Sequence, residues 1–511
     1  MNAICRRWMP AMLLLAIASD QALGQFVSQG YLSGAAARRI GLKSVWNKQI
    51  ASSLAYGTIS DIFQFVSADS YYNIHKITAN GRTILISERG LDRHGNLLGK
   101  DQAAYLAKQT VVSLKEGGHD PEHVTRQVPE VMLYLTSSDA MVHAIDAETG
   151  RKIWSATVGK PGYPTLRPAA NEKILAVISG SSLYLLRRSS GEIYWKERLT
   201  GVPAAGPAVS DQMVFTMASN GLVEAFRLDE LDKAPLGFQS MGRGRARPRV
   251  STGTVSWSTE LGHLYVGDAL LGKVKYRLEA DGAIRTQPAF AGSKGLVTST
   301  VGGLVYGLDR LSGEIQWRTT TGRDSHFPPV VVGDGVYILS EPSGMSRLHT
   351  KTGERQWWVT GITQFLAVSK ERIYCLDDRQ RLLLLNIETG AVVGATSARG
   401  IELALANWQT DRILMGTNKG RIQYFREQAL DTPLIHVKLY PSPKHNEERE
   451  KTADSKRETR HDDRDDKAVK SSDDGSDLDT EDAAEDGNPF EFEGDAADDP
   501  FGSDDDDNPF G

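Results

Sequence analysis

The sequence predicts an all-β fold, an eight-bladed β-propeller with four-stranded blades, and three observations support this prediction. A unit of about 41 residues recurs along the chain. Each unit repeats the same order of apolar strands and turn residues. One further strand, near the N-terminus, completes the last unit. A repeat of this length cannot bury both of its faces alone, so neighbouring units must stack against one another.

The tight turn before one apolar strand of each unit gives the count. The intervals between successive turns are 41, 40, 41, 41, 41, 36 and 40 residues. Unrelated apolar strands would not keep this spacing over such a length, so we count eight units. The eight turn positions are Ala140, Ser181, Gly221, Gly262, Gly303, Gly344, Gln380 and Gly420.

A second signal in each unit is a Ser/Thr-Gly turn followed by an outer strand that carries an aromatic residue. The clearest copy joins the strand at 141–146 to Thr149, Gly150 and Trp154. Glycine accepts the positive φ that such a turn requires. A tryptophan has a large face to pack and an indole N–H to satisfy, so we expect it to wedge between neighbouring sheets. The aromatic residues at this repeat position are Trp46, Trp154, Trp195, Tyr276, Trp317 and Trp357.

The two ends of the repeat region predict how the ring closes. The last unit, 412–426, has two strands but no outer strand after it. Residues 41–46 read as an outer strand that has no unit before it, and Trp46 occupies the aromatic position. Pairing the two segments would remove an open sheet edge.

Residues 58–118 do not follow the repeat and are predicted to form an insertion packed on the ring. Apolar alternation predicts three strands, Asn80-Gly81 predicts a tight hairpin turn, and a helix is expected from Asp101 to Glu116. A ninth blade is the alternative. The predicted strands are 61–68, 71–78 and 83–87, and the other segments are 1–24 (signal peptide), 25–57 (N-terminal segment with the closing strand), 119–430 (propeller) and 431–511 (disordered acidic tail).

The first 24 residues are typical of a secretory signal peptide, with a basic start, a short apolar run and small residues at 22–24. Cys5 lies inside this segment, which leaves Cys375 as the one cysteine of the mature chain and excludes an intramolecular disulfide. No other apolar run is long enough to span a bilayer. We therefore expect an exported protein of the periplasm or cell envelope, without a membrane span.

The charge is unevenly distributed. From residue 441 onward there are 26 acidic and 9 basic residues, a balance of −17, which leaves +11 for the preceding chain. High charge and low hydrophobicity predict disorder in the tail. Three Asn/Asp-Pro-Phe copies present Phe490, Phe501 and Phe510 as candidate residues for docking on a partner. The alternative is a tail that only improves solubility.

A cluster of arginines is the most specific surface feature. In the third unit the Gly-to-Trp strand is missing, and a loop carries Arg243, Arg245, Arg247 and Arg249 instead. Guanidinium groups close together attract carboxylate or phosphate, so we predict a site for an anion or a partner protein. The acidic tail is one candidate that would screen this loop. The alternative is a solvated, flexible loop.

The repeats resemble the pyrroloquinoline-quinone-like (PQQ-like) propeller family. The matching segments are 144–154 and 305–317, and the resemblance extends over about 41–426 outside the insertion. The family contains quinone-bearing alcohol and glucose dehydrogenases. It also contains the propeller subunit of the outer-membrane β-barrel assembly machine, which the resemblance implies binds partner proteins without a cofactor.

The residues favour a protein like the assembly subunit over a quinone-bearing dehydrogenase. The dehydrogenases of this family typically place adjacent cysteines over the quinone and hold calcium with Glu, Asn and Asp, and no such set is assignable in this sequence. The assembly subunit is normally a lipoprotein, and the lipid-bearing cysteine is also missing. His119 and His123 are separated by Pro121, which predicts a loop and not a metal site. We assign no catalytic, cofactor or metal residue.

The predicted function is a non-enzymatic scaffold of the cell envelope that binds unknown envelope proteins. An anionic polymer or lipid is a further candidate partner, whereas nucleic acid is a poor target for an exported protein. The alternatives are a PQQ-dependent dehydrogenase and a propeller that binds carbohydrate or cell wall.

Trp257 and Trp408 fall outside the aromatic repeat position, which makes them candidates for a contact in the central funnel or on the surface. The alternative for both is packing in the core, which is the usual place of such side chains.

Overall fold

The computed structural model describes residues 31–50 and 57–439. The signal segment and the tail phenylalanines Phe490, Phe501 and Phe510 lie outside the described residues, so what was expected of them stays a prediction. Among the described residues, no helix combines the length and apolarity needed to cross a membrane.

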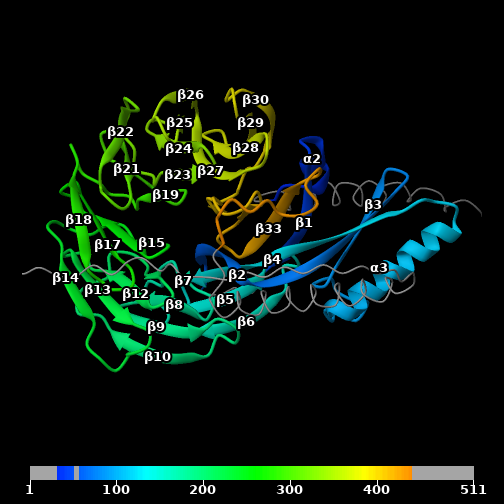
Figure 1. The fold of residues 1–511 in the computed structure, drawn as a ribbon, viewed down its shortest axis with the longest axis horizontal. Coiled ribbons are helices and arrows are strands. Elements are labelled where there is room, and N and C mark those ends of the chain that lie inside the picture. Colours follow the sequence, from blue (N-terminus) through cyan, green and yellow to red (C-terminus); the bar gives the residue numbers. More distant parts are fainter. Residues whose placement is uncertain (1–30, 51–56, 440–511) are drawn as a thin grey trace, which may run out of the picture. The chain divides into compact units, whose positions relative to one another are not determined.

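The described strands form eight antiparallel sheets, numbered 1 to 8 in chain order (Figure 1). Sheet 1 contains five strands and each of the others contains four. The strands of sheet 1 are β2 (Ile59–Ala79), β3 (Arg82–Ser87), β4 (Glu122–Ser137), β5 (Met141–Asp146) and β6 (Lys152–Thr157).

Sheets 2 to 7 each take four consecutive strands, which pair in chain order from the innermost to the outermost. The strands of sheets 2 to 4 are β7 (Ala169–Ala170), β8 (Ile174–Ser179), β9 (Ser182–Arg187), β10 (Ile193–Arg198); β11 (Ala208–Val209), β12 (Met213–Met217), β13 (Leu222–Arg227), β14 (Leu236–Gln239); β15 (Arg249–Ser251), β16 (Thr254–Ser258), β17 (His263–Asp268) and β18 (Val274–Glu279). The strands of sheets 5 to 7 are β19 (Ala289–Ala291), β20 (Gly295–Ser299), β21 (Leu304–Asp309), β22 (Ile315–Thr320); β23 (Val330–Val332), β24 (Gly335–Ser340), β25 (Gly344–His349), β26 (Arg355–Thr360); β27 (Ile362–Val368), β28 (Arg372–Asp377), β29 (Arg381–Asn386) and β30 (Val392–Ser397).

Sheet 8 joins the two ends of the described chain. Its strands β31 (Leu403–Ala404), β32 (Ile413–Gly416) and β33 (Arg421–Glu427) are followed by β1 (Leu42–Gln49) from the N-terminal segment, in which Trp46 lies opposite Tyr424. A short helix, α2 (Gly34–Arg39), precedes β1, and the hydroxyl of Ser33 caps it by accepting the Ala36 N–H.

Apolar packing links the sheets in a cycle. Eight buried clusters each combine side chains of two sheets that are neighbours in the numbering, and one of these clusters combines sheet 8 with sheet 1. The all-β propeller class predicted from the sequence is confirmed. The eight turn positions counted in the sequence fall one in each sheet, where the second strand meets the third.

The aromatic repeat position explains the Ser/Thr-Gly turn. The indole N–H of Trp317, in sheet 5, donates to the carbonyl of Thr350 in sheet 6 at 2.8 Å. The same ring covers Gly353, where a Cβ would lie 2.3 Å from it. Trp46 covers Gly150 of sheet 1 in the same way, and Tyr276 covers Gly313 of sheet 5. Five of the six aromatic residues therefore cover the glycine turn of the next sheet, where a side chain would not fit. Trp195 is the exception, because sheet 3 lacks that turn, and it packs against Phe226 instead.

Sheet 1 differs from the others by an elongated hairpin, which we call the arm and define as residues 67–130. The inner part of β2 pairs with the inner part of β4 in the ring, and both strands then continue outward past a register shift between Val66 and Tyr71. Beyond it, β3 and helix α3 (Gly99–Glu116) complete the arm, which extends away from the sheets in Figure 1. The arm has its own small core, formed by Tyr72, Ile74 and Val128.

The structure differs from the predicted boundaries in three places. The expected strands 61–68 and 71–78 are one continuous strand, β2, because a bulge and not a turn separates them. The expected boundary at 118 falls before β4, which runs unbroken from the arm into the ring, so β2 and β4 belong both to the arm and to sheet 1. The tail was expected from 431, but Asp431 forms ion pairs and Ile435 bridges to Thr410 of sheet 8.

Candidate functional site

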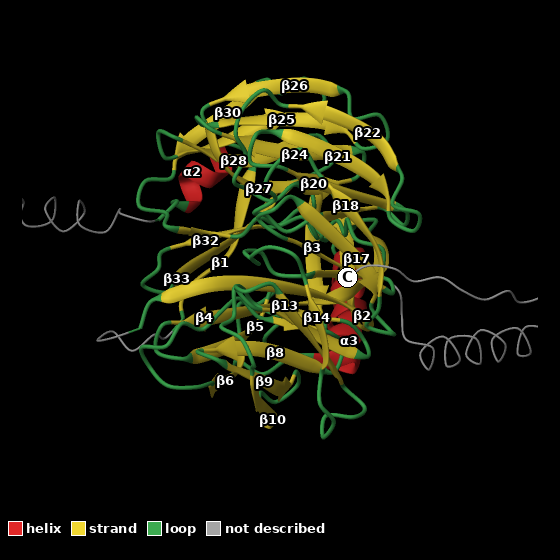
Figure 2. Cartoon of the chain, turned by 90° about the vertical axis from the view of Figure 1, so that its left-hand side faces the viewer, coloured by secondary structure: helices red, strands yellow, loops and turns green. Residues whose placement is uncertain are grey.

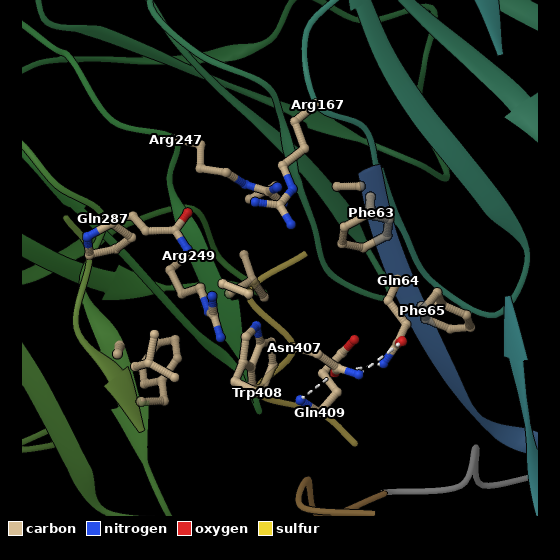
Figure 3. Close-up of a pocket in the computed structure, with 18 of the residues that line it drawn as sticks. Phe63, Gln64, Phe65, Arg167, Arg247, Arg249, Gln287, Asn407, Trp408 and Gln409 are labelled. Carbon is tan, nitrogen blue, oxygen red and sulfur yellow. Dashed lines mark hydrogen bonds between the residues drawn. The ribbon is translucent and has the colours of Figure 1, made fainter. Parts of the chain in front are cut away.

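A cavity of about 230 Å³ lies where the innermost strands converge. Residues in or directly beside the first strands of seven sheets line it, and Figure 3 shows a close-up. Figure 2 gives the arrangement of the surrounding strands. The polar and aromatic residues of its lining are Phe63, Gln64, Phe65, Arg167, Arg247, Arg249, Gln287, Phe290, Asn407, Trp408 and Gln409. The described lining contains no carboxylate.

Three arginine side chains point into this cavity (Figure 3). Arg167 precedes β7, Arg247 precedes β15, and Arg249 is the first residue of β15. The Nε atoms of Arg167 and Arg247 are buried and have no hydrogen-bond partner. The nearest carboxylate is Asp61, whose Oδ1 lies 3.6 Å from Arg167 Nε. Within the described part of the chain, Arg247 and Arg249 have no ion pair.

Aromatic rings support two of these cations. The guanidinium of Arg249 lies 4.1 Å from the ring centre of Trp408, and that of Arg247 lies 5.6 Å from the ring centre of Phe63. A guanidinium that packs against a ring keeps its N–H edge available for another partner. The cavity therefore contains positioned donors whose partners are not supplied by the described protein.

The electrostatic cost of this arrangement appears in the pKa values. Burial, together with the charges of Arg167 and Arg249, lowers the pKa of Arg247 to about 9, against the opposing effect of Asp61. Burial and the charge of Arg167 lower the pKa of Arg249 to about 10. Both groups remain mainly cationic near neutral pH, so an anion in the cavity would relieve the repulsion between them.

The predicted four-arginine cluster divides into two pairs. Arg247 and Arg249 enter the cavity, whereas Arg243 and Arg245 are exposed outside it. Arg245 Nε lies 2.9 Å from Glu260 Oε1. The sequence did not predict this division, because only the start of the inner strand β15 at Arg249 brings the second pair to the cavity. Gly244, within the exposed pair, is packed so closely against sheet 3 that a Cβ would lie 2.7 Å from the Ala218 carbonyl.

Arg167 was missed by the sequence analysis, although a signal for it exists. Arg167 and Arg247 each directly precede a proline that leads into an innermost strand, and Gln287 occupies the same position before β19. All three line the cavity.

Of the two tryptophans outside the aromatic repeat position, Trp408 also lines the cavity. Trp257 is buried in the core and donates its N–H to Ser240 Oγ at 2.8 Å.

A second polar cluster fixes the arm to the ring. Arg89 of the arm contacts Asp146 of β5 and donates to Glu130 at 2.6 Å. Glu130 also accepts from Arg188 of sheet 2 at 3.1 Å, and Arg188 lies 3.4 Å from Glu172. Although burial opposes it, the charges of Arg89 and Arg188 lower the pKa of Glu130. We call these five residues the anchor cluster.

Further hydrogen bonds hold the start of the arm at the same place. Glu172 accepts the Ser67 hydroxyl at 2.6 Å and the Ala68 N–H at 2.5 Å. On the other side of the arm, Lys76 Nζ lies 3.0 Å from Asp431 Oδ2. A chain of alternating charges thus connects the arm to two sheets and to the segment that follows β33.

The arm presents an apolar surface to solvent. On α3, Tyr105 is 60% exposed and Val112 is 48% exposed, and the spacing of seven residues puts both on one side of the helix. Ile84 of β3 and Val124 of β4 are exposed too. Exposed apolar side chains on a projecting element are candidates for contact with another protein.

The described residues do not fit a calcium-bound quinone. No group of three or more His, Cys, Asp or Glu side chains could hold a metal ion among them. Cys375 is fully buried between sheets 6 and 7, away from the cavity, and burial raises the pKa of its thiol. His119 and His123 have separate neighbours, Asn80 and His75. We derive no step through a metal or a quinone.

The fold and its repeats define a propeller of the PQQ-like kind. A family model described as "Outer membrane protein assembly factor BamB" matches residues 138–234 and 246–402. The chain is therefore a PQQ-like repeat propeller related to BamB. The match begins at 138, after the arm.

The chain is similar to BamB proteins and, over a shorter part of its length, to a tetrathionate hydrolase. The BamB of Moranella endobia (strain PCIT) is 21% identical over 338 residues, which cover 60% of this chain and 86% of that protein. The BamB of Yersinia pestis is 24% identical over 52% of this chain and 64% of its own length. The tetrathionate hydrolase of Acidithiobacillus ferrooxidans is 24% identical over 43% of this chain and 50% of its length.

The fold has a counterpart among solved structures. The crystal structure of BamB from Moraxella catarrhalis aligns with a TM-score of 0.50 at 15% sequence identity. The alignment covers 58% of this chain and 92% of that one. At this identity the similarity supports the fold, and it carries no residue-level assignment.

Proposed function

We propose that the protein is an exported, non-enzymatic scaffold of the cell envelope, and that the arm is the element that docks a partner protein. The relationship to BamB, an outer membrane protein assembly factor by its name, supports a protein-binding role in the envelope. The arm lies outside the matched residues, so it would give this chain a contact of its own.

The observation that carries the proposal is an anchored arm whose helix exposes two large apolar side chains among polar ones. Five charged residues fix its base to sheets 1 and 2. Its helix exposes Tyr105 and Val112, and burying such side chains at an interface contributes favourably to binding. Because the arm is already ordered, little conformational entropy would be lost on docking.

Cross-linking in intact cells tests the proposal. A photoreactive amino acid at Tyr105 is expected to give a discrete cross-linked species with an envelope protein. The control places the same group at Val202, which is 73% exposed in the loop before β11 and lies outside the arm. Equal cross-linking from both positions, or none from Tyr105, would contradict the arm as the docking element.

The enzyme alternative has a separate test. Purified full-length protein is mixed with PQQ and calcium, and its absorbance spectrum is compared with that of free quinone. We expect no protein-bound quinone spectrum. A stoichiometric bound spectrum with dye reduction on an alcohol or a sugar would replace the scaffold by a quinoprotein dehydrogenase.

A further inference from the structure

The central cavity presents three guanidinium groups without a matching set of carboxylates. Hydrogen bonds to charged donors are among the stronger polar contacts in proteins, and a buried donor without a partner costs free energy. Arg167 and Arg247 both leave a buried Nε without a hydrogen bond. A folded protein that retains such an arrangement gains stability from any ligand that supplies oxygen acceptors.

The walls of the cavity fit an anion that also carries apolar groups. Trp408 and Phe63 pack against the guanidinium groups of Arg249 and Arg247, and Phe290 lies on the lining as well. The amide of Gln287 adds a polar group that can donate or accept a hydrogen bond (Figure 3). Mixed aromatic and cationic walls suit acidic side chains next to an aromatic residue or a proline.

The size of the cavity limits the ligand. About 230 Å³ accommodates a few side chains of an extended segment and excludes a folded domain. Because the lining belongs to the innermost strands, a flat surface such as a bilayer cannot reach the arginines. An acidic peptide segment meets both conditions.

We propose that Arg167, Arg247 and Arg249 form a binding site for the carboxylates of an acidic peptide segment inside the ring. The site is separate from the arm, so it goes beyond the proposed function and can fail independently of it. Such a segment could come from a partner or from this chain, whose residues 441–511 contain 26 acidic and 9 basic residues.

Fluorescence anisotropy tests the site with a labelled peptide of the sequence 495–511, which holds two of the Asp/Asn-Pro-Phe copies. The full-length double variant Arg247→Gln/Arg249→Gln is expected to bind about tenfold to a hundredfold more weakly than the unaltered chain, the range for losing charged hydrogen bonds. Its melting temperature and circular dichroism spectrum show that it is folded.

The same loop supplies a matched control. Arg243→Gln/Arg245→Gln removes the same charge from the exposed pair, so its affinity should stay within about twofold of that of the unaltered chain. An equal loss in both variants would show general surface attraction and overturn the proposal. No loss in either variant, or full displacement of the peptide by millimolar inorganic phosphate, would overturn it too. So would binding of phosphatidylserine vesicles that depends on Arg247 and Arg249.

A second part of the experiment identifies the source of the peptide. A chain ending at Asn446 keeps the whole compact unit that contains the ring. Tighter binding of the labelled peptide by this shortened chain than by the full chain indicates that the chain's own acidic segment competes. Equal binding indicates a partner as the source. In both cases the shortened chain must bind the peptide more weakly when it carries Arg247→Gln/Arg249→Gln. If the two substitutions leave its affinity unchanged, the proposed site is wrong.

Discussion

At the scale of single residues, stability depends on contacts that cross from one sheet to the next. The indole of Trp317 lies on Gly353 of the following sheet and donates to Thr350. A glycine here meets two conditions together, a positive φ of 69° and the absence of a Cβ in the space that the indole fills. The repeated glycine therefore has a packing role as well as a conformational one.

The first prediction separates these two roles. Gly353→Ala places a Cβ 2.3 Å from the Trp317 ring, whereas Gly333→Ala, at a similar positive φ, meets no atom within 4 Å. Overpacking typically costs about 1–3 kcal/mol, so Gly353→Ala should lower the free energy of unfolding by that much more than Gly333→Ala. Chemical denaturation measures both. Equal losses would show that backbone strain alone accounts for the glycine.

A second prediction concerns Glu148, which lines a cavity of about 360 Å³ between the arm and the ring. Burial, and next the charge of Asp146, raise the pKa of this carboxyl against the effects of Ser87, Tyr72 and Arg89. The unfolded chain ionises Glu148 at a lower pH than the folded chain does. Stability is therefore lost as pH rises from the ordinary glutamate pKa through the raised folded value.

Glu148→Gln mimics the protonated form and should raise the melting temperature at pH 7.5 by about 1–2 °C, with little difference at pH 4. Thermal unfolding at both pH values measures this. The exposed Glu314→Gln serves as the control and should change neither value. A melting temperature for Glu148→Gln that is lower at pH 7.5 than that of the unaltered chain would show that the ionised carboxylate is stabilising.

The residue scale also shows what the sequence could predict. The aromatic and glycine positions were predicted because each repeats with the period of the sheets. Arg247 and Arg249 were selected as a charge cluster, but their separation from Arg243 and Arg245 depends on where the inner strand β15 begins. Arg167 does not belong to a local cluster of charge, and its only signal in the sequence is the position before an inner-strand proline that it shares with Arg247.

At the scale of elements, the arm is an elongated version of a connection that the other sheets make briefly. In sheet 4, for example, Thr252 and Gly253 alone join the first strand to the second. In sheet 1 the same two strands continue outward and carry β3 and α3 between them. The sequence predicted strands and a helix in this region, but a continuous strand with a bulge has no turn residue to mark where the ring ends.

The anchor cluster leads to a third prediction. Arg89→Met removes the ion-pair partner of Asp146 and one of the two ion-pair partners of Glu130, and breaking a partly buried charge pair costs about 2–4 kcal/mol. We expect faster amide hydrogen exchange in the arm segment of β4, with the ring strands unchanged. Arg93→Met, an exposed arginine of the arm, is the control. Unchanged exchange in Arg89→Met would show that Arg89 does not fix the arm.

Acid should weaken the same cluster. The pKa of Glu130 is lowered in the folded chain. The ionised carboxylate therefore contributes to the free energy of unfolding above the ordinary glutamate pKa, and this contribution is lost as pH falls through the lowered value. Acid should therefore speed amide hydrogen exchange in the arm of the unaltered chain, and should speed it less in Arg89→Met.

At the scale of the whole molecule, the ring is closed by apolar clusters between successive sheets, and the arm adds to it at one point. The repeats predicted this ring because their regular spacing identifies the equivalent strands of successive sheets. The function was less predictable, since related propellers share the fold, the arm lies in a segment without a repeat, and the residue before the inner-strand proline differs from one sheet to another. The account therefore assigns partner binding to the arm and stability to the ring.

One variant tests this assignment directly. Replacing residues 67–130 with Asn-Gly joins Val66 to Val131, which already lie opposite each other, through a two-residue hairpin like those of the other sheets. The decisive measurement is the size of the native envelope complex that contains the tagged chain, in mild detergent extracts of cells. The account predicts a larger complex for the full chain, and a folded but uncomplexed ring for the shortened one. A shortened chain that still enters the same complex would contradict it.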